Sequence, residues 1–412
     1  MAFQNQKLKV LIVFGTRPDA IKMAPVIKEF SKDPAFDVLL CDTGQHDSTV
    51  TNAIMNFFDV HGKTARLETM IPGQTLNHIV QNVIVGIDNI LEMFVPDIML
   101  VQGDTTSAMA ATIAGFNRRT FFGHIEAGMR TGNIENPYPE EFNRCIIDKA
   151  ASILFAPTQF DSENLGKEGI DKNYIFTVGN TSIDSLIYCK DKIPKYMPRS
   201  DNFSEYVLVT IHRRESFGNG IKNIIKSINE IAKLNEDIGF IWPVHPNPNI
   251  NPFVYELINV KNIIACEPFD YMRSIHMIQN ATAIITDSGG VQEEATTFAI
   301  PTIIARDKTD RMGHKNIGEI KQSAADYVRI FKDNFILAGT STDKIINAFE
   351  KISKNFQKRR KLLSMSKRPP RIYPVYGDGL ASKRIVAIIK QKFGIEPCYF
   401  PDPPSFSYAN WK

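Results

Sequence analysis

Residues 286–295 combine the residue types that anion binding requires. They follow the apolar run 281–285, which predicts a buried strand, and residues 291–298 can continue as a helix. The glycines of the corner 288–290 have no Cβ, so a ligand can approach the backbone closely, and the start of a helix favours a phosphate. Glu294, about one turn further on, could accept hydrogen bonds from a sugar hydroxyl. The pattern predicts a nucleotide or nucleotide-sugar site; the alternative is a helix start that Ser288 caps, with glycines that serve only the turn.

Three acidic residues of the first half stand near the ends of predicted strands or at the start of a helix. Asp104 follows one strand, Glu126 follows the next, and Glu140 lies beyond the second strand behind Pro139, which we expect at the first position of a helix. Glu126 has apolar and small neighbours, and a partly buried carboxylate can act as a general acid or base. Helix capping would also explain Asp104, and the helix dipole would explain Glu140. The functional prediction is that the three carboxylates converge at one edge of a sheet.

Basic residues follow the first predicted strand of each half. Arg17 and Lys22 lie five residues apart across a helix start, where two cations beside backbone N–H groups suit a diphosphate. In the second half, His212 lies in a loop with two arginines and several glycines, and it could supply a proton or a positive charge. A single histidine in a loop is more often structural, and nearby prolines would explain His245 as part of a rigid turn.

The elements that must position these residues alternate between strand-like and helix-like runs. Strands are expected at residues 8–14, 36–41, 98–101, 120–124, 206–210, 240–244, 263–265, 283–285 and 302–304. Helices are expected at residues 18–30, 107–116 and 382–393. This alternation predicts an α/β fold with two Rossmann-like domains, each a parallel sheet with helices on both faces, and ligands in a cleft outside the carboxyl ends of the strands.

A polar, helix-poor stretch at residues 190–204 predicts the linker between the domains. We therefore expect a first domain at residues 1–190 that carries the carboxylates and a second at residues 205–375 that binds the nucleotide. A helical segment at 376–394 follows, and the tail 395–412, rich in proline and aromatic residues, is expected to be draped on the surface or disordered.

Composition excludes several classes of function. A net charge of +3 over 412 residues, without a dense basic block, gives no reason to expect a nucleic-acid partner. The five cysteines have no CxxC spacing, which argues against a zinc site and a disulfide framework and suits a reducing cytoplasm. The polar start of the chain predicts no signal peptide, and no run reaches the ~18–20 apolar residues of a membrane span.

Taken together, these segments resemble the non-hydrolysing UDP-N-acetylglucosamine 2-epimerases. The matching segments, in the order of that family, are residues 14–25, 43–46, 103–106, 123–158, 210–220, 243–248, 286–295 and 376–379. Several long motifs in order are far more specific than any one of them. The hydrolysing relatives look less similar at the first loop, where this chain carries Thr-Arg-Pro-Asp-Ala-Ile-Lys.

The resemblance implies the two-domain arrangement of the B-type glycosyltransferases (GT-B), with the last helix crossing back to the first domain. It implies interconversion of UDP-N-acetylglucosamine (UDP-GlcNAc) and UDP-N-acetylmannosamine (UDP-ManNAc) without a redox cofactor or a metal, by elimination and re-addition of UDP. It further implies a cytoplasmic homodimer that supplies precursors of cell-surface polysaccharide. Acidic side chains of the first domain would then meet a diphosphate held by the second.

The resemblance also assigns roles to individual residues. The essential acid–base residues would be Asp104, Glu126, Glu140 and His212. Contacts to the substrate and to UDP would come from Arg17, Lys22, Arg144, Ser288, Gly289, Gly290, Glu294 and Arg311. Bacterial members bind a second UDP-GlcNAc as an activator, and Gln45, His46, Arg214 and His245 fall at that site. Our hypothesis is that Asp104 and Glu126 serve the chemistry at C2 and that His212 helps UDP to leave.

Some positions depart from the family pattern. Ser48 replaces a glutamine and Gly73 an arginine near the activator site, and residues 312–314 read Met-Gly-His where Pro-Glu is usual. The substrate could therefore be a related UDP-linked 2-acetamido sugar, such as a diacetamido uronic acid or a 6-deoxy sugar. The rival readings are a hydrolysing epimerase, a GT-B glycosyltransferase and a non-catalytic UDP-sugar sensor. The carboxylates argue against the last two, since a binding module needs no buried base.

Overall fold

The structure is a computed structural model and describes residues 7–71, 73–194, 203–213, 217–245, 251–311, 335–354, 356, 375–396 and 398. The described residues fall into two compact units. The first holds those up to Ser185 together with those from Tyr376 onward, and the second holds those from Leu186 to Val375. Among the predictions above, Arg214, residues 312–314 and most of the tail lie outside the described residues.

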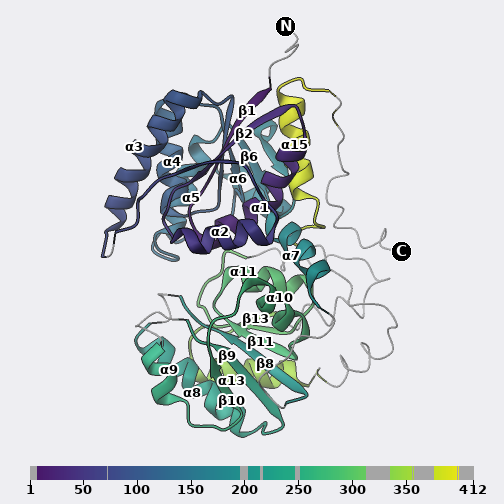
Figure 1. Cartoon of the computed structure of the whole chain (residues 1–412). Coiled ribbons are helices and arrows are strands. Elements are labelled where there is room, and N and C mark those ends of the chain that lie inside the picture. Colours follow the sequence, from purple (N-terminus) through teal and green to yellow (C-terminus); the bar gives the residue numbers. More distant parts are fainter. Residues whose placement is uncertain are drawn as a thin grey trace. The chain divides into compact units, whose positions relative to one another are not determined.

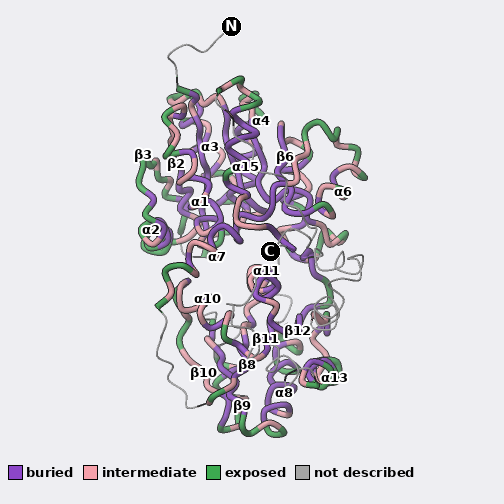
Figure 2. The backbone as a smooth tube through the Cα atoms, turned by 90° about the vertical axis from the view of Figure 1, so that its right-hand side faces the viewer, coloured by how far each residue is buried: buried purple, intermediate pink, exposed green. Residues whose placement is uncertain are grey.

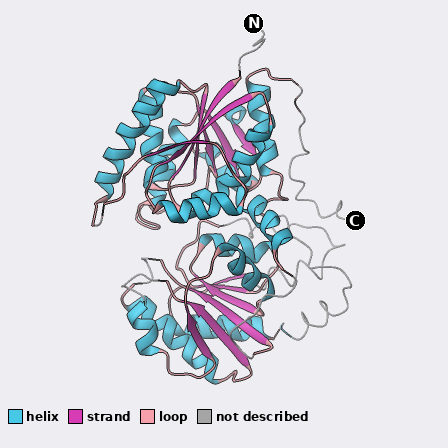
Figure 3. Cartoon of the chain, in the orientation of Figure 1, coloured by secondary structure: helices cyan, strands magenta, loops and turns pink. Residues whose placement is uncertain are grey.

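The first unit is built on a seven-stranded parallel sheet, with strand order β3-β2-β1-β4-β5-β6-β7. Figure 3 shows strands of this unit with helices around them. Its strands are β1 (Leu8–Phe14), β2 (Phe36–Asp42), β3 (Lys63–Arg66), β4 (Ile98–Gln102), β5 (Phe122–Ile125), β6 (Ile153–Ala156) and β7 (Ile175–Thr177). Val10 of β1 pairs with Val38 on one side and Ile98 on the other, so β1 is an inner strand. All but one of its side chains are buried, as expected for a parallel strand covered on both faces.

Helices cover both faces of this sheet. They are α1 (Arg17–Lys32), α2 (Ser48–Phe57), α3 (Leu76–Phe94), α4 (Thr106–Asn117), α5 (Glu140–Ala150), α6 (Gln159–Lys167), the short 3₁₀ helix η1 (Lys172–Tyr174), α7 (Thr181–Lys192) and α15 (Ala381–Lys392). α1 packs against α15 on one side of the sheet, and α4 packs between α3 and α5 on the other (Figure 1). The last described helix thus belongs to the first unit, and α7 runs across the boundary between the units.

The second unit has a six-stranded parallel sheet, with strand order β10-β9-β8-β11-β12-β13. Its strands are β8 (Glu205–Thr210), β9 (Ile238–Pro243), β10 (Ile263–Cys266), β11 (Ala283–Thr286), β12 (Thr302–Ile304) and β13 (Phe335–Leu337). Its helices are α8 (Asn219–Lys233), α9 (Asn251–Leu257), α10 (Tyr271–Asn280), α11 (Gly289–Thr297) and α13 (Thr342–Ser353). The inner strands of each unit are buried, while exposed positions gather on the outer helices and loops (Figure 2).

Each sheet contains a point where the chain order reverses. In the first unit it lies between β1 and β4, and in the second between β8 and β11. Helices that follow the two strands at such a point lead away in opposite directions and leave room for a ligand outside the carboxyl ends of the strands. Most of the candidate residues stand there: Arg17 and Asp104 follow the first pair of strands, and His212 and Ser288 follow the second.

The predicted α/β class with two parallel sheets is confirmed, and most predicted elements differ from the observed ones by one or two residues at their ends. The strand expected at residues 120–124 is observed as β5, which begins two residues later at Phe122, because the N–H of Thr120 still bonds to Gly115 at the end of α4. Pro139 stands just before α5 rather than at its first position. In the described part of the chain, no helix combines the length and the apolar character that a membrane span needs.

Candidate functional site

Glu126 is a tightly held carboxylate of the first unit. It directly follows β5 with a left-handed backbone (φ 74°), and it is buried. The ammonium group of Lys22 lies 2.7 and 2.6 Å from its two oxygens, and the side-chain amide of Gln102 donates to Oε2. A backbone conformation that is sparsely populated for residues other than glycine is commonly kept where function needs it. Glu126 is therefore a buried carboxylate with little freedom to turn.

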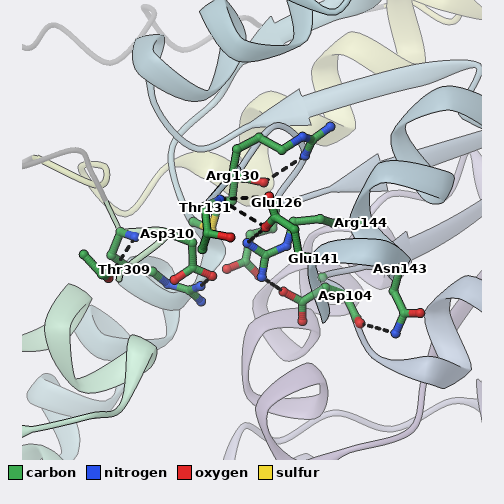
Figure 4. A network of polar contacts seen from close by, with 12 residues as sticks. Asp104, Glu126, Arg130, Thr131, Glu141, Asn143, Arg144, Thr309 and Asp310 are labelled. Carbon is green, nitrogen blue, oxygen red and sulfur yellow. Dashed lines mark hydrogen bonds and ion pairs between the residues drawn. The ribbon is translucent and has the colours of Figure 1, made fainter. Parts of the chain in front are cut away.

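The loop that follows β4 and carries Asp104 passes close to Glu126 at Gly103. A Cβ added to the neighbouring Gly103 would stand 3.6 Å from Oε2 of Glu126. The alternative that Asp104 caps α4 is wrong, because Thr105 is the cap and its hydroxyl accepts from the N–H of Ala108 at 3.2 Å. The carboxylate of Asp104 instead accepts from Arg144, and its backbone carbonyl accepts from Asn143 at 2.9 Å (Figure 4). Asp104 is thus oriented by α5.

The start of α5 carries a second buried acid. Glu141 accepts hydrogen bonds from the N–H groups of Thr131 and Gly132, and it lies 3.4 Å from Arg144. Arg144, which the resemblance placed at the substrate, thus contacts the carboxylates of both Asp104 and Glu141. Glu140 is the first residue of α5 and partly buried. The described contacts tie Asp104 to α5 and place Gly103 close to Glu126, while the convergence of the carboxylates of Asp104, Glu126 and Glu140 stays a prediction.

The first turn of α1, shortly after β1, holds a further buried acid, Asp19. Oδ2 of Asp19 accepts from the N–H groups of Gly15 and Thr16, and Oγ1 of Thr105 lies 3.4 Å away. The pKa of Asp19 rises to about 7, mainly because the group is buried, with the charge of Asp104 adding to the rise and hydrogen bonds from Thr16 and Gly15 opposing it. Asp19 therefore joins the loops that follow β1 and β4.

The two basic residues of the first loop have different surroundings. Lys22 was expected near the nucleotide, and in the structure its ammonium group pairs with Glu126. Arg17 is partly exposed at the start of α1, and its backbone N–H donates to Nδ1 of His46 at 3.1 Å. Lys22 thus holds the carboxylate of Glu126 by an ion pair, while Arg17 remains a candidate for phosphate binding.

The residues predicted for an activator site differ in where they lie: two are in the first unit, one is in the second, and one is outside the described residues. Oε1 of Gln45 accepts from the hydroxyl of Ser107 at 2.6 Å, at the start of α4, and His46 accepts from α1. His245 lies in the second unit, and Arg214 is outside the described residues. Gln45 and His46 therefore support the first turns of α4 and α1, which carry the candidate site.

In the second unit, Asp287 organises the loop after β8. This fully buried carboxylate accepts from the N–H groups of His212, at 3.0 Å, and Arg213, at 2.8 Å. The ring of His212 stacks on that of His245, with centroids 5.7 Å apart. Burial lowers the pKa of His212, the cations Arg213 and Arg306 lower it further, and Asp287 opposes them without reversing the direction. An anion bound near this ring would favour its protonated form.

The Ser-Gly-Gly corner forms the start of α11, as predicted. Ser288 stands at the cap position, but its side chain makes no capping hydrogen bond to the described helix, so the capping alternative is not supported. The first N–H groups of any α-helix have no acceptor within the helix. A Cβ on Gly289 would lie 2.9 Å from the guanidinium carbon of Arg311, which Glu293 and Asp310 hold in place. This helix start therefore offers N–H groups and a fixed cation, with Glu294 in its second turn.

Sequence reasoning missed several residues that orient these groups. They are Gln102, His124, Glu141, Asn143 and Asp287, all buried. A signal was present, since Gln102 ends the apolar strand β4, and Asp287 directly follows the apolar strand β11. A polar residue at the carboxyl end of a buried parallel strand points to the ligand-binding edge of the sheet.

Known proteins match this chain along nearly its whole length. The family model described as UDP-N-acetylglucosamine 2-epimerase matches residues 28–390. The UDP-N-acetylglucosamine 2-epimerase of Yersinia pestis is 36% identical over 394 residues, which cover 93% of this chain and 98% of the relative. That of Campylobacter jejuni is 39% identical over 395 residues, which cover 92% and 97%.

A solved structure agrees with the sequence matches. The crystal structure of UDP-GlcNAc 2-epimerase from Neisseria meningitidis bound to UDP-GlcNAc has a TM-score of 0.81 and 35% identity, and the match covers 93% of this chain and 100% of that chain. The resemblance read from the motifs is therefore confirmed. This chain is an enzyme of the isomerase class and belongs to the UDP-N-acetylglucosamine 2-epimerase family.

Proposed function

We propose that the enzyme interconverts UDP-GlcNAc and UDP-ManNAc without hydrolysing them, by elimination and re-addition of UDP. The observation that carries this proposal is the buried carboxylate of Glu126, which Lys22 and Gln102 hold close to the loop that bears Asp104. The relative from Neisseria meningitidis was solved with UDP-GlcNAc bound, which supports a UDP-sugar as the substrate. On the family pattern, the product would serve the synthesis of cell-surface polysaccharide precursors.

Elimination needs a base that is held close to a weakly acidic C–H bond. One carboxylate would take the proton from C2, the electron pair would form a C1–C2 double bond, and the bond from C1 to the UDP oxygen would break. Re-addition returns UDP to C1 and delivers a proton to the opposite face of C2. Asp104 and Glu126 follow the adjacent strands β4 and β5, and their carboxylates have separate partners, which suits one group for each face of C2.

The departing UDP gains negative charge and needs groups that stabilise it. The start of α11 would supply this through its free N–H groups, the closely approachable Gly289 and the cation of Arg311. His212 would assist by protonation or by its charge, and Glu294 would bind the ribose hydroxyls. In this proposal the second unit binds UDP and the first unit performs the proton transfers.

The test is to incubate the protein with UDP-GlcNAc in deuterated water and to follow the reaction by NMR. We expect deuterium at C2, both epimers, and no free sugar. Release of N-acetylmannosamine with UDP would indicate a hydrolysing epimerase instead. Consumption of the sugar nucleotide only when an acceptor is added would indicate a glycosyltransferase, and binding without turnover would indicate a sensor.

A variant tests the role of Glu126 directly. Glu126→Gln should abolish C2 deuteration while UDP still binds, because the amide keeps the shape of the side chain but cannot take a proton. Glu135→Gln is the control, since Glu135 is exposed in the same unit and should leave the exchange rate unchanged. Exchange that persists in the Glu126→Gln variant would remove Glu126 from the mechanism.

A further inference from the structure

His124 is a fully buried histidine that the chemistry above does not use. It lies on β5, two residues before Glu126. Its Nδ1 is 2.6 Å from a carboxylate oxygen of Asp148, and its Nε2 is 2.8 Å from the backbone carbonyl oxygen of Gly103. A carbonyl can only accept a hydrogen bond, so Nε2 must carry the hydrogen that it donates. The imidazole therefore links α5 to the loop after β4.

The carboxylate of Asp148 is itself held by several donors. Besides His124, it lies 2.8 Å from Nη1 of Arg130 and accepts from the N–H of Gly128 at 3.1 Å. Burial by itself would raise the pKa of Asp148, but His124 and Arg130 outweigh it and hold the pKa below its usual range. Arg130 is fixed in turn by two hydrogen bonds to Glu168. The imidazole ring of His124 is thus anchored at Nδ1 and free to turn only if this network breaks.

The acceptor of His124 is next to a proposed catalytic group. The carbonyl of Gly103 belongs to the peptide unit before the Cα of Asp104, and the carbonyl of Asp104 belongs to the unit after it. His124 donates to the first and Asn143 donates to the second at 2.9 Å. Gly103 has φ 71°, a left-handed conformation that glycine adopts without strain, so the chain turns sharply at this point. Two buried side chains therefore hold the peptide units on both sides of Asp104.

We propose that His124 and Asn143 are a pair of positioning residues for Asp104. By holding both flanking peptide units they set the direction of the Cα–Cβ bond of Asp104, and Arg144 then orients its carboxylate. This inference rests on the proposed function, in which Asp104 acts at C2. A shift of about 1 Å in a catalytic group can cost on the order of 10²-fold in rate, so the loss of either donor lowers kcat.

Two substitutions at His124 separate its two hydrogen bonds. The amide nitrogen of asparagine falls near the position of Nδ1, and that of glutamine falls near Nε2. His124→Asn therefore keeps a donor for Asp148 and loses the one for Gly103, whereas His124→Gln does the reverse. We expect kcat to fall by about 10–100-fold in His124→Asn, because a misplaced catalytic group can cost on the order of 10²-fold in rate. The kcat of His124→Gln should be at least about ten times higher than that of His124→Asn. The KM for UDP-GlcNAc and the affinity for UDP should change less than about twofold in both.

Asn143→Leu provides the second variant, because the leucine side chain branches at Cγ as that of asparagine does and has no donor. It should lower kcat as His124→Asn does, and the double variant should lose less than the product of the two single losses, because both act on one loop. Equal losses in the two His124 variants, or a wild-type kcat in His124→Asn, would overturn the inference. A rise in KM that parallels the fall in kcat would also overturn it.

Hydrogen exchange tests the same idea without turnover. Amides of residues 103–107 should exchange faster in His124→Asn and Asn143→Leu than in His124→Gln and in the wild type. Unchanged exchange in both of the first two variants would refute the positioning role even if the wild type were inactive. A wild type that does not epimerise UDP-GlcNAc would instead contradict the proposed function, so the two failures can be told apart.

Discussion

The ion pair between Lys22 and Glu126 is the central contact at the scale of single residues. Both side chains are nearly inaccessible, with 11% and 6% of their areas exposed. Bringing two charges out of water is costly, and removal of one partner leaves the other charge buried without compensation. The pair is therefore more informative about function than about stability.

Lys22→Met should lower the free energy of unfolding by about 3–5 kcal/mol, because it leaves the carboxylate of Glu126 uncompensated. The double variant Lys22→Met/Glu126→Gln should recover much of that loss, because neither of the two side chains then carries a charge. Urea denaturation measures both. Lys32→Met is the control, since its pair with Glu29 is exposed and should contribute less than about 1 kcal/mol. A double variant that is as unstable as the sum of its single changes would contradict this account.

The start of α1 shows how one element serves the site. Thr16 caps the helix, and Asp19 completes a capping box in which each side chain bonds to the backbone of the other residue. Asp19 is also the buried acid whose pKa rises to about 7. Residues that cap a helix are ordinarily exposed. Because Asp19 is buried and its pKa is raised, the stability of the start of α1 depends on pH.

Since the native pKa of Asp19 lies above the unfolded value, the folded state binds the proton more tightly. The stabilising contribution of the Asp19 side chain is therefore complete below about pH 4, and it is lost as the pH rises through about 7. The stability of the wild type relative to Asp19→Asn should therefore fall between pH 4 and pH 8, by on the order of 1.4 kcal/mol for each unit of pKa shift. Thermal or urea unfolding at several pH values measures this difference.

The control for Asp19 is an aspartate at the other end of the same helix. Burial tends to raise the pKa of Asp33, but hydrogen bonds and the charge of Lys390 hold it below its usual value. Its contribution is present above about pH 4 and lost only below that, so the wild type relative to Asp33→Asn should show no slope between pH 4 and pH 8. Equal slopes for the two variants would argue against a raised pKa at Asp19.

At the scale of the whole molecule, the chain returns to its first unit at the end. The N–H groups of Ala381 and Ser382 donate to the buried Asp184, which caps the start of α15. Lys390, near its other end, pairs with Asp33 at 2.8 Å. Ile385 and Ile389 of this helix are fully buried. The first unit is therefore complete only when residues about 200 positions apart in the sequence have come together.

Ile385→Ala and Ile389→Ala should each lower the free energy of unfolding by about 2–5 kcal/mol, because each leaves a cavity in the core. Hydrogen exchange should show the loss of protection among residues of the first unit, up to Ser185. The exposed Gln391 on the same helix provides the control, and Gln391→Ala should change stability by less than about 0.5 kcal/mol. A loss confined to residues 186–375 would contradict this placement of α15.

The sequence by itself determined the α/β class, most strands near the candidate site, the family, and the residue types that could do chemistry. These are local properties: a run of apolar residues marks a buried strand, and a polar or glycine-rich segment directly after it marks the edge where parallel strands bind ligands. Asp104, Glu126, His212 and the Ser288 corner could all be selected in this way.

Only the tertiary structure decided which of these groups contact one another. Lys22 and Glu126 are 104 residues apart, and Asp104 and Arg144 are 40 apart. Their pairing depends on the order of strands in the sheet, which places β1 beside β4 and β4 beside β5 and so gathers their carboxyl ends at one edge. Sequence periodicity reports how each segment is buried but not which segment becomes its neighbour, because that choice depends on packing energies summed over the whole unit.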